Sequence, residues 1–278
     1  MKLIARDKIL NLDAPVVMGV LNVTPDSFSG DGDVDTAAAV KHGLRIAAEG
    51  AAIIDVGGES SRPGAAKVSA QDELDRVLPV VRELAGKTDA IISVDTHKPV
   101  VAEAVLEAGA HIINDITGLR DAEIAKVVAK YGAGVIIMHM QGTPDTMQLD
   151  PGYFDVVAEV TDFFRERIEL AHAHGVRDEQ IALDPGIGFG KNLEHNLALL
   201  RATPLFRKTF PHPLLIGASR KSMIGKLTGR EAMEGRIFGT VAVTALVVRD
   251  GANIVRVHDV RANRDAMVMA RAIDGMHK

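Results

Sequence analysis

Polar side chains that can do chemistry stand at or near the ends of short apolar runs along this chain. They are Asn22, Asp95, Asn114, Asp184 and His258. Carboxylates and amides can pair with the edge of a heterocyclic ring, and a histidine can meet an anion or carry a proton. Any one of them could simply cap a helix or a turn. Their shared position relative to the apolar runs favours one common site.

Cationic side chains follow the last two of these runs. Arg220 and Lys221 come directly after one run, and Arg256 stands two residues before His258 in the other. Residues 195 to 230 contain seven Lys or Arg and no Asp or Glu. A solvated basic face is the alternative interpretation of such a segment. The position of the cations after the strands favours an anionic substrate, because barrels commonly bind phosphate there.

Eight apolar runs must position these side chains. Runs of this length without alternation of apolar and polar residues are typical of parallel strands that are buried on both faces. They extend from Val16 to Asn22, Ala52 to Ser60, Ile91 to Asp95, Ile112 to Ile116, Gly134 to His139, Ile181 to Asp184, Leu214 to Ser219 and Ile254 to Asp259. Eight such strands predict a closed barrel.

Amphipathic stretches long enough for helices lie between the runs. In one of them, Ile124, Val127, Val128 and Tyr131 follow helical spacing between a capping candidate, Asp121, and Gly132. Further helices are expected to start at Thr36, Asp72, Pro99, Asp155, Gly235 and Arg261. The alternation predicts an α/β protein, a single (β/α)8 TIM barrel domain over residues 1–278. The active site of such a barrel lies at the C-terminal mouth of its strands.

The composition excludes several classes of protein. The chain has 278 residues, 47% of them hydrophobic and 25% charged, with a net charge of −5 and no cysteine. These values indicate an ordinary globular core and exclude disulfides, a thiolate nucleophile and a strongly basic nucleic-acid surface. No apolar run approaches the ~20 residues of a membrane span, and charges interrupt the N-terminal segment. We therefore expect a cytoplasmic enzyme with no membrane or nucleic-acid partner.

Two glycine-containing segments resemble nucleotide-binding motifs only superficially. GIGFG, at residues 186–190, has the spacing G-x-G-x-G, and no acid follows about 20 residues later. ASRKSMIGK, at residues 218–226, carries Arg220 where a P-loop requires its first glycine. Neither a dinucleotide site nor a Walker A motif is predicted.

Eight motifs in chain order resemble those of the dihydropteroate synthases. They are MGVLNVTPDSFS, DVGGESSRPGA, SVDTHKP, INDITG, MHMQGTP, LDPGIGFGKN, GASRKSMIG and RVHDV. The resemblance spans nearly the whole chain, from about Val16 to Asp259. It implies a pterin-binding barrel that condenses dihydropterin-6-ylmethyl diphosphate with 4-aminobenzoate in folate biosynthesis.

The resemblance also implies a role for each matching residue. Pterin binding falls to Asp95, Asn114, Asp184 and Lys221, with Met138 and Phe189 as walls for the ring. Diphosphate binding falls to Asn22, Arg256 and His258, with Mg²⁺ bridging Asn22 and the phosphate oxygens. The 4-aminobenzoate pocket would consist of Ser61, Arg62, Pro63, Ser219 and Lys221. The residues expected to act in catalysis are Asp95, Lys221, Arg256 and His258.

The chain departs from the pattern of the family at two points. Ser61 stands where many relatives carry threonine, so the hydroxyl is kept and a methyl group is lost. The first loop reads SFSGDGD instead of the commoner SFSDGG. The resemblance further implies a homodimer that sulfonamides inhibit by competition. Loss of pyrophosphate before amine attack, an SN1-like route, is expected because the electron-rich ring stabilises the exocyclic cation.

Two other functions compete with this interpretation. A pterin-binding methyltransferase of the corrinoid-linked type would share the barrel and its pterin-holding Asp and Asn residues. The segments ESSRPG and SRKS suit a benzoate carboxylate and a diphosphate, and they have no clear use in methyl transfer. A pterin-binding scaffold without turnover would be expected to have lost Asp95, Lys221 or Arg256, and all three are present.

Overall fold

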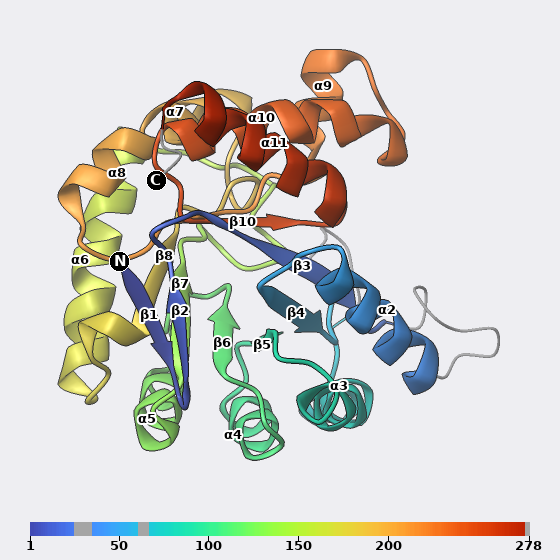
Figure 1. Cartoon of the computed structure of the whole chain (residues 1–278). Helices are drawn as coiled ribbons and strands as arrows, with labels where there is room; N and C mark the ends of the chain where they lie inside the picture. The colour runs from blue at the N-terminus through green and yellow to red at the C-terminus, as the bar shows by residue number, and fades with distance from the viewer. Residues whose placement is uncertain (25–34, 61–66, 276–278) are drawn as a thin grey trace.

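The computed structural model describes residues 1–24, 35–60 and 67–275. Within these ranges, eight parallel strands form one sheet that curls around a central axis (Figure 1). The strands are β3 (Val16–Asn22), β4 (Ile53–Gly57), β5 (Ile91–Asp95), β6 (Ile112–Asp115), β7 (Gly134–Met138), β8 (Ile181–Asp184), β9 (Leu215–Ile216) and β10 (Ile254–Val257). The predicted parallel α/β barrel is confirmed.

The barrel closes between β8 and β9, where the pairing is weakest. A single bridge joins Leu183 to Leu214, and the Leu183 N–H donates to the Pro213 carbonyl at 2.9 Å. The sequence predicts a strand from Leu214 to Ser219, but β9 is only two residues long. After Ile216 the chain leaves the sheet. The other seven strands end within three residues of the predicted ends.

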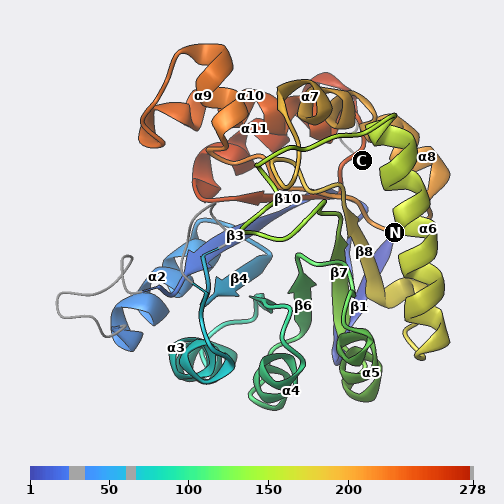
Figure 2. The same ribbon diagram turned by 180° about the vertical axis from the view of Figure 1, so that it is seen from behind.

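Helices surround the sheet on its outer side, as the view from behind also shows (Figure 2). They are α2 (Thr36–Ala48), α3 (Ala70–Ala85), α4 (Pro99–Glu107), α5 (Ala122–Tyr131), α6 (Val156–Ala173), α7 (Leu193–Arg201), α8 (Thr203–Thr209), α9 (Ser222–Thr228), α10 (Ile237–Arg249) and α11 (Val260–Ile273), with short 3-10 turns η1 (Asp178–Gln180) and η2 (Glu234–Arg236). The sequence interpretation missed α7, α8 and α9, which are short.

Most predicted helix starts agree with the structure to within two residues. Thr36 and Pro99 are first helical residues, and Asp121 and Asp155 are N-caps whose side chains accept backbone N–H bonds. Gly132 ends α5 with φ 61°, a left-handed conformation in which glycine carries no steric penalty. A local capping signal thus fixed these boundaries.

An antiparallel hairpin that the sequence interpretation did not predict closes the N-terminal end of the barrel. It consists of β1 (Lys2–Ala5) and β2 (Lys8–Asn11). Its buried residues pack against one inward-facing residue from each barrel strand: Leu3, Ala5, Leu10 and Leu12 meet Met18, Ile53, Ile91, Ile112, Ile136, Ala182, Leu215 and Ile254. Water is therefore excluded from this end, and the site must lie at the other end.

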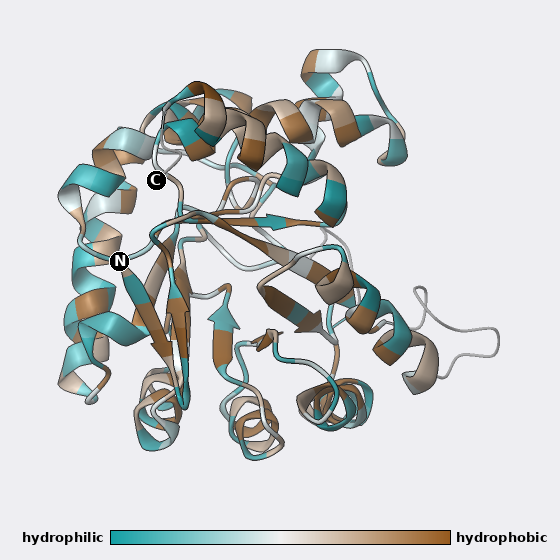
Figure 3. Cartoon of the chain, in the orientation of Figure 1, coloured by the Kyte–Doolittle hydropathy of each residue, from teal (hydrophilic) through white to brown (hydrophobic). Residues whose placement is uncertain are grey.

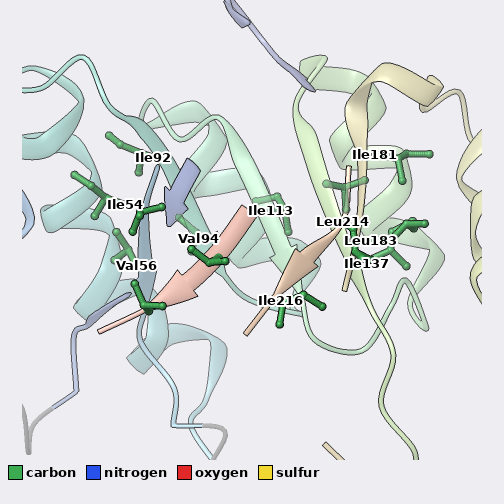
Figure 4. Packing of buried hydrophobic residues seen from close by; sticks show 14 of the residues in the cluster. Ile54, Val56, Ile92, Val94, Ile113, Ile137, Ile181, Leu183, Leu214 and Ile216 are labelled. Atoms are coloured by element: carbon green, nitrogen blue, oxygen red, sulfur yellow. The ribbon is translucent and has the colours of Figure 1, made fainter. Parts of the chain in front are cut away.

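Alternation along each strand separates the outer core from the barrel interior. Side chains such as Ile54, Val56, Ile92 and Val94 point outward and form a large cluster with the helices (Figure 4). Hydropathy colouring shows the strands as mostly apolar, with polar residues facing solvent on the helices (Figure 3). We call the hairpin and the apolar strand residues that it contacts the plug. In each strand, the next side chain that points inward lies two residues after the plug residue. At that higher level the interior becomes polar.

Among the described residues, no helix is both long enough and apolar enough to cross a bilayer.

Candidate active site

Strand register brings the predicted strand-end residues into two neighbouring rows at the mouth of the barrel. Asn22 pairs with Gly57, Gly57 with Asp95, and Asp95 with Asn114 along four neighbouring strands. Further around the barrel, Met138 pairs with Asp184. All of these residues share the inward parity of the apolar plug beneath them. Asn22, Asp95, Asn114, Met138 and Asp184 therefore face a common interior, as the sequence predicted.

Arg256 projects into this interior from β10 and joins two carboxylates. Its Nε lies 2.6 Å from Oδ2 of Asp55, and its Nη2 lies 2.9 Å from Oδ2 of Asp95. The Nδ2 of Asn114 donates to the same Asp55 oxygen at 3.1 Å. One fully buried carboxylate thus orients both the guanidinium and an amide that the sequence assigned to the site.

Asp55 is the site residue that the sequence interpretation missed. That interpretation looked for polar residues at strand ends, and Asp55 lies in the middle of β4. The sequence did contain a signal, because Asp55 stands between apolar residues of a buried strand. A charged residue in such a place is almost never buried without a partner. Period-two spacing also placed Asp55 on the same face as Ile53, which packs in the plug.

The environment of Asp95 disfavours its charge. Burial, together with the nearby carboxylates of Asp55, Glu73 and Asp115, raises the pKa of Asp95 to about 7, although Arg256 acts in the opposite direction. In the protein without ligand, the Asp95 carboxyl therefore titrates close to neutral pH. A cation that arrives beside it would favour the ionised form.

Asp184 follows β8 at a tight turn. Its Oδ1 accepts the Gly186 N–H at 2.7 Å, so the side chain does cap the Asp-Pro-Gly turn. That bond uses one oxygen and fixes the orientation of the carboxylate. Burial raises the pKa of Asp184, whereas the charge of Lys221 lowers it. The capping interpretation and the binding interpretation are thus compatible.

Lys221 reaches back across the mouth towards the loop after β8. Its Nζ donates to the carbonyl of Ile187 and lies 4.5 Å from the centroid of the Phe189 ring. Burial lowers the pKa of Lys221 to about 8, and the nearby Asp184 carboxylate opposes that shift. A flat heterocycle bound near Phe189 would meet both the ammonium and the carboxylate.

The apolar wall of the site is a small cluster rich in methionine. Met138 belongs to it, and the half-buried Phe189 packs against it. The other members are Ile116, Met140 and Met147. Thioether side chains adapt to flat ligands and pack well against rings. Both predicted wall residues therefore lie in one apolar surface beside Lys221.

His258 and Ser219 are joined at the ends of neighbouring strands. The Ser219 hydroxyl oxygen accepts the backbone N–H of His258 at 3.2 Å and lies 2.9 Å from His258 Nδ1. When the Ser219 hydroxyl donates its own proton to Nδ1, the neutral ring carries its proton on Nε2. An imidazole in that form can donate to an anion.

Arg220, expected near the phosphate end, is committed to another partner. Its Nε and Nη2 donate to the two oxygens of Asp259 at 2.9 and 2.5 Å. Its φ of 57° is unusual for a residue with a side chain, and Thr240 and Arg236 bond its backbone. Arg220 is therefore tied to Asp259, whereas Lys221 and Arg256 are the cations that the described residues place beside Asp184 and Asp95.

Ser61, Arg62 and Pro63, predicted for the 4-aminobenzoate pocket, lie outside the described residues. The ends of their segment are nevertheless visible. Glu59 Oε1 accepts the Val68 N–H at 3.1 Å and so ties the two ends together.

Lys98, at the start of α4, stabilises the link between Glu59 and Val68. Its Nζ lies 2.6 Å from Glu59 Oε2 and also bonds the buried carboxylate of Glu73. The hydrogen bonds of Lys98 and Val68 favour the charged form, and the pKa of Glu59 lies below its ordinary value although burial alone would raise it. The base of the segment is therefore fixed by charge.

Asn22 could hold Mg²⁺ only together with a bound substrate that supplies further oxygen ligands. In the part of the chain that the structure describes, no group of three or more His, Cys, Asp or Glu could hold a metal ion. Asn22 offers a single neutral amide oxygen, which is a weak site for a bare cation. Mg²⁺ usually completes its octahedron with waters and substrate phosphates. The residues thus fit an ion that arrives with a diphosphate.

Known proteins are similar to this chain over nearly its whole length. The family model described as pterin binding enzyme matches residues 18–258. The dihydropteroate synthase of Escherichia coli strain K12 is 49% identical over 273 residues, which cover 98% of this chain and 96% of the relative.

Two solved structures superpose on nearly the entire chain. One is the Yersinia pestis dihydropteroate synthase in complex with a sulfonamide drug, with a TM-score of 0.93, 46% identity, and coverage of 99% of this chain and 100% of that one. The other is the Xanthomonas albilineans enzyme with 4-aminobenzoic acid, with a TM-score of 0.92, 46% identity, and coverage of 98% and 97%. The fold of this chain is therefore shared with dihydropteroate synthases solved with a sulfonamide drug and with 4-aminobenzoic acid.

Proposed function

The chain belongs to the dihydropteroate synthase family of pterin-binding enzymes, and we propose that its barrel mouth performs that family's condensation with the residues described above. The reaction joins (7,8-dihydropterin-6-yl)methyl diphosphate to 4-aminobenzoate and releases pyrophosphate. The observation that carries the assignment of roles is the register row that joins Asn22, Asp95 and Asn114, with Arg256 bonded to Asp95 and coupled by charge to Asp184. One barrel over residues 1–278 suffices in this proposal.

The pterin ring would lie between the apolar wall and these polar side chains. The carboxylate of Asp184 suits the adjacent N–H donors of a 2-amino-4-oxo pyrimidine edge. Lys221 and Asn114 suit the ring carbonyl and a ring nitrogen. Met138 and Phe189 would contact the faces of the ring. Burial of Asp184 strengthens the pairing, because charge-assisted hydrogen bonds are stronger where water is excluded.

The leaving group would lie against Arg256 and His258. The methylene C–O bond breaks and its electrons leave with the diphosphate, whose growing charge Arg256 and the His258 Nε2–H stabilise. The remaining cation is delocalised over the dihydropterin ring beside Asp95. Because a cation favours the ionised form of that carboxyl, Asp95 stabilises the intermediate more than the ground state.

The amine of 4-aminobenzoate then attacks the methylene carbon and forms the C–N bond. Its lone pair is available at neutral pH, so the step needs no strong general base, and the released proton goes to pyrophosphate or solvent. Ser61, Arg62, Pro63, Ser219 and Lys221 are the proposed contacts of this substrate. Sulfonamides of similar shape would compete for the same place.

Mg²⁺ is the proposed cofactor, held by the amide oxygen of Asn22 together with diphosphate oxygens. When bound, it would supply positive charge to the leaving group. Asn22 suits this role because it contributes an oxygen ligand at the same level as Asp95.

A homodimer is proposed, with α10 and α11 as the shared surface. Phe238 and Leu246 on α10, and Met269 and Ile273 on α11, expose large apolar side chains. The inner face of α10 is partly polar, since Thr240 and Thr244 are buried there. A helix with apolar residues on its outer face is expected to have a partner.

A cytoplasmic location stays a prediction.

A direct assay tests the proposed function. Purified protein is incubated with the pterin diphosphate, 4-aminobenzoate and Mg²⁺, and 7,8-dihydropteroate and pyrophosphate are followed by mass spectrometry and by an enzyme-coupled assay. We expect equimolar formation of both products. Methyl transfer from an N5-methylated folate to a corrinoid protein, with no dihydropteroate formed, would instead favour the corrinoid-linked methyltransferase.

A further inference from the structure

The loop after β8, GIGFG at residues 186–190, has each of four successive carbonyl groups held by a different side chain. Lys221 donates to the carbonyl of residue 187, Gln148 to that of 188 at 2.6 Å, Lys191 to that of 189 at 2.9 Å, and Tyr153 to that of 190 at 2.7 Å. The loop that resembles a nucleotide-binding turn is thus a rigid platform. Its amides are engaged as well, since the N–H groups of Gly186 and Gly188 donate to Asp184 and Asn196.

Lys191 differs from the other three donors because it holds the loop from the buried side. The residue is 3% exposed. Besides the Phe189 carbonyl, its Nζ bonds the His139 carbonyl at 3.2 Å and His139 Nδ1 at 3.0 Å. An ammonium has three donors, and three acceptors surround this one. The arrangement therefore matches the charged form of the lysine.

The three acceptors belong to the two walls of the pterin pocket. Phe189 is one wall, and His139 directly follows Met138, the other. The loops that carry them are in backbone contact, since a Cβ on Gly186 would lie 1.9 Å from the His139 carbonyl oxygen. His139 is suited to accept, because burial lowers its pKa to about 3 and keeps the ring neutral.

Resting on the proposed function, we propose that Lys191 is a positioning residue for the pterin: its buried ammonium joins the loops after β7 and β8 and holds Phe189, Met138 and Asp184 in binding geometry. Lys191 does not reach the substrate in this proposal. It acts through the backbone of its neighbours and through its charge.

The charge of Lys191 acts on the carboxylate of Asp184. The positive charge of Lys191 lowers the pKa of Asp184, in opposition to the effect of burial. Burial in turn lowers the pKa of Lys191 itself to about 7, with Asp184 favouring and Lys221 disfavouring its charged form. The charged and titratable groups that face Lys191 are Asp184 and His139 at the strand ends and Lys221 before α9. Its support of the pocket should therefore fade above neutral pH.

The test compares wild type with Lys191→Met, which keeps an unbranched side chain and removes the ammonium. Lys226→Met, on exposed α9, is the matched control. The probe is 6-hydroxymethylpterin, whose Kd is measured by calorimetry from about pH 6 to about pH 8.5. Inorganic pyrophosphate with Mg²⁺ is titrated in parallel as a measure of an intact fold and phosphate end.

We expect Lys191→Met to weaken pterin binding about tenfold or more at pH 6, with pyrophosphate affinity unchanged. The ratio of the two Kd values should fall towards one at pH 8.5, where wild type has lost the proton from Lys191. Ionisation of the free pterin affects both proteins alike and cancels in the ratio, whereas the higher pKa of Asp184 in the variant is part of the expected effect. In turnover, KM for the pterin should rise while kcat changes little.

A ratio of one at pH 6, or a loss that is the same at all pH values, would overturn the inference. Should Lys191→Met fail to fold, Lys191→Gln, which retains two uncharged donors, is judged by the same ratio and pH profile. If wild type itself does not bind 6-hydroxymethylpterin, the proposed function fails and this inference falls with it. If wild type binds the pterin but the ratio of the two Kd values does not change with pH, only the proposed role of Lys191 is rejected.

Discussion

The guanidinium Nε of Arg256 lies 2.6 Å from Oδ2 of Asp55, although 201 residues separate them in the chain. Asp55 is fully buried, and its other oxygen has no hydrogen-bond partner among the residues that the structure describes. Its Oδ2 is stabilised by the Arg256 cation and by the Asn114 amide, so loss of the cation would leave a buried charge without its main partner. The pair therefore fixes the cation that is proposed to meet the departing diphosphate.

Arg256→Ala is expected to lower kcat by about 10²-fold or more, because one preorganised donor to the leaving group is lost. Affinity for 6-hydroxymethylpterin should change far less, since that ligand lacks the diphosphate. Asp55→Asn should also lower kcat, because Arg256 would keep its charge and lose its orientation. Steady-state kinetics with calorimetry measure both effects. Unchanged turnover at saturating substrate would move the phosphate site elsewhere.

Asp184→Asn should keep the fold and lose useful pterin binding. An amide presents one acceptor where two adjacent N–H donors require a carboxylate, and removing one partner of a buried charge-assisted pair costs about 3 kcal/mol or more. Calorimetry with 6-hydroxymethylpterin gives the loss. Asp162→Asn, the same change on the exposed face of α6, is the control. Pterin affinity near that of wild type in the Asp184 variant would sink the assignment.

Asp95→Asn should change the pH dependence of stability. The pKa of Asp95 is raised from 3.8 to about 7 in the fold, so between these values the folded protein binds the extra proton and wild type loses stability as pH rises. The asparagine variant lacks this loss. Its unfolding free energy relative to wild type should therefore grow from pH 4 to pH 7, by about 1–4 kcal/mol, and then level off.

Urea unfolding at several pH values measures that slope. The slope of stability with pH carries the test, because the charge interaction between Asp95 and Arg256 is already contained in the pKa of Asp95. A difference that is independent of pH, or one that shrinks as pH rises, would contradict the assigned environment of Asp95. The variant should also turn over more slowly at every pH, since no carboxylate faces the cationic ring.

Binding of 4-aminobenzoate should depend on the anion that precedes it. Its proposed contacts Ser61, Arg62 and Pro63 stand in a segment rich in glycine and serine, whose ordering costs conformational entropy. Pyrophosphate with Mg²⁺, held by Arg256 and His258, should lower that cost. Calorimetry should show positive coupling of ~1–3 kcal/mol. Equal affinity with and without pyrophosphate, with Mg²⁺ present in both titrations, would indicate a preformed pocket.

Phe238→Asp should convert the proposed dimer into monomers. Phe238 is 84% exposed on α10, and a charge in the centre of an apolar interface would be buried without a partner. Sedimentation equilibrium measures the mass. Val100→Asp, on the exposed face of α4, is the matched control and should stay dimeric. A wild type that is monomeric at micromolar concentration would remove this part of the proposal.

Local patterns in the sequence predicted much of this architecture. Apolar runs without alternation predicted the barrel strands, and β3, β5 and β8 have the predicted bounds. Side-chain caps at Asp121 and Asp155 marked helix starts. These features depend on residues within a few positions of each other. Backbone preference and side-chain period act at that range, so the sequence alone determines them.

The plug hairpin and the partners of the site depended on distant contacts. Nothing near β1 and β2 indicates that they will cover the interior of eight later strands. Arg220 and Arg256 are chemically alike in sequence, yet one is bound to Asp259 and the other to Asp55 and Asp95.

Sequence by itself predicted the barrel strands and their chain order, although β9 is shorter than predicted and the β1–β2 hairpin was missed. Tertiary structure alone decided that Asp55 orients Arg256 and that Lys191 lies buried behind Phe189. The physical reason is that closing the barrel brings charges from distant strands into a space without water. There, a carboxylate or an ammonium must find its partner through the fold, because solvent no longer supplies one.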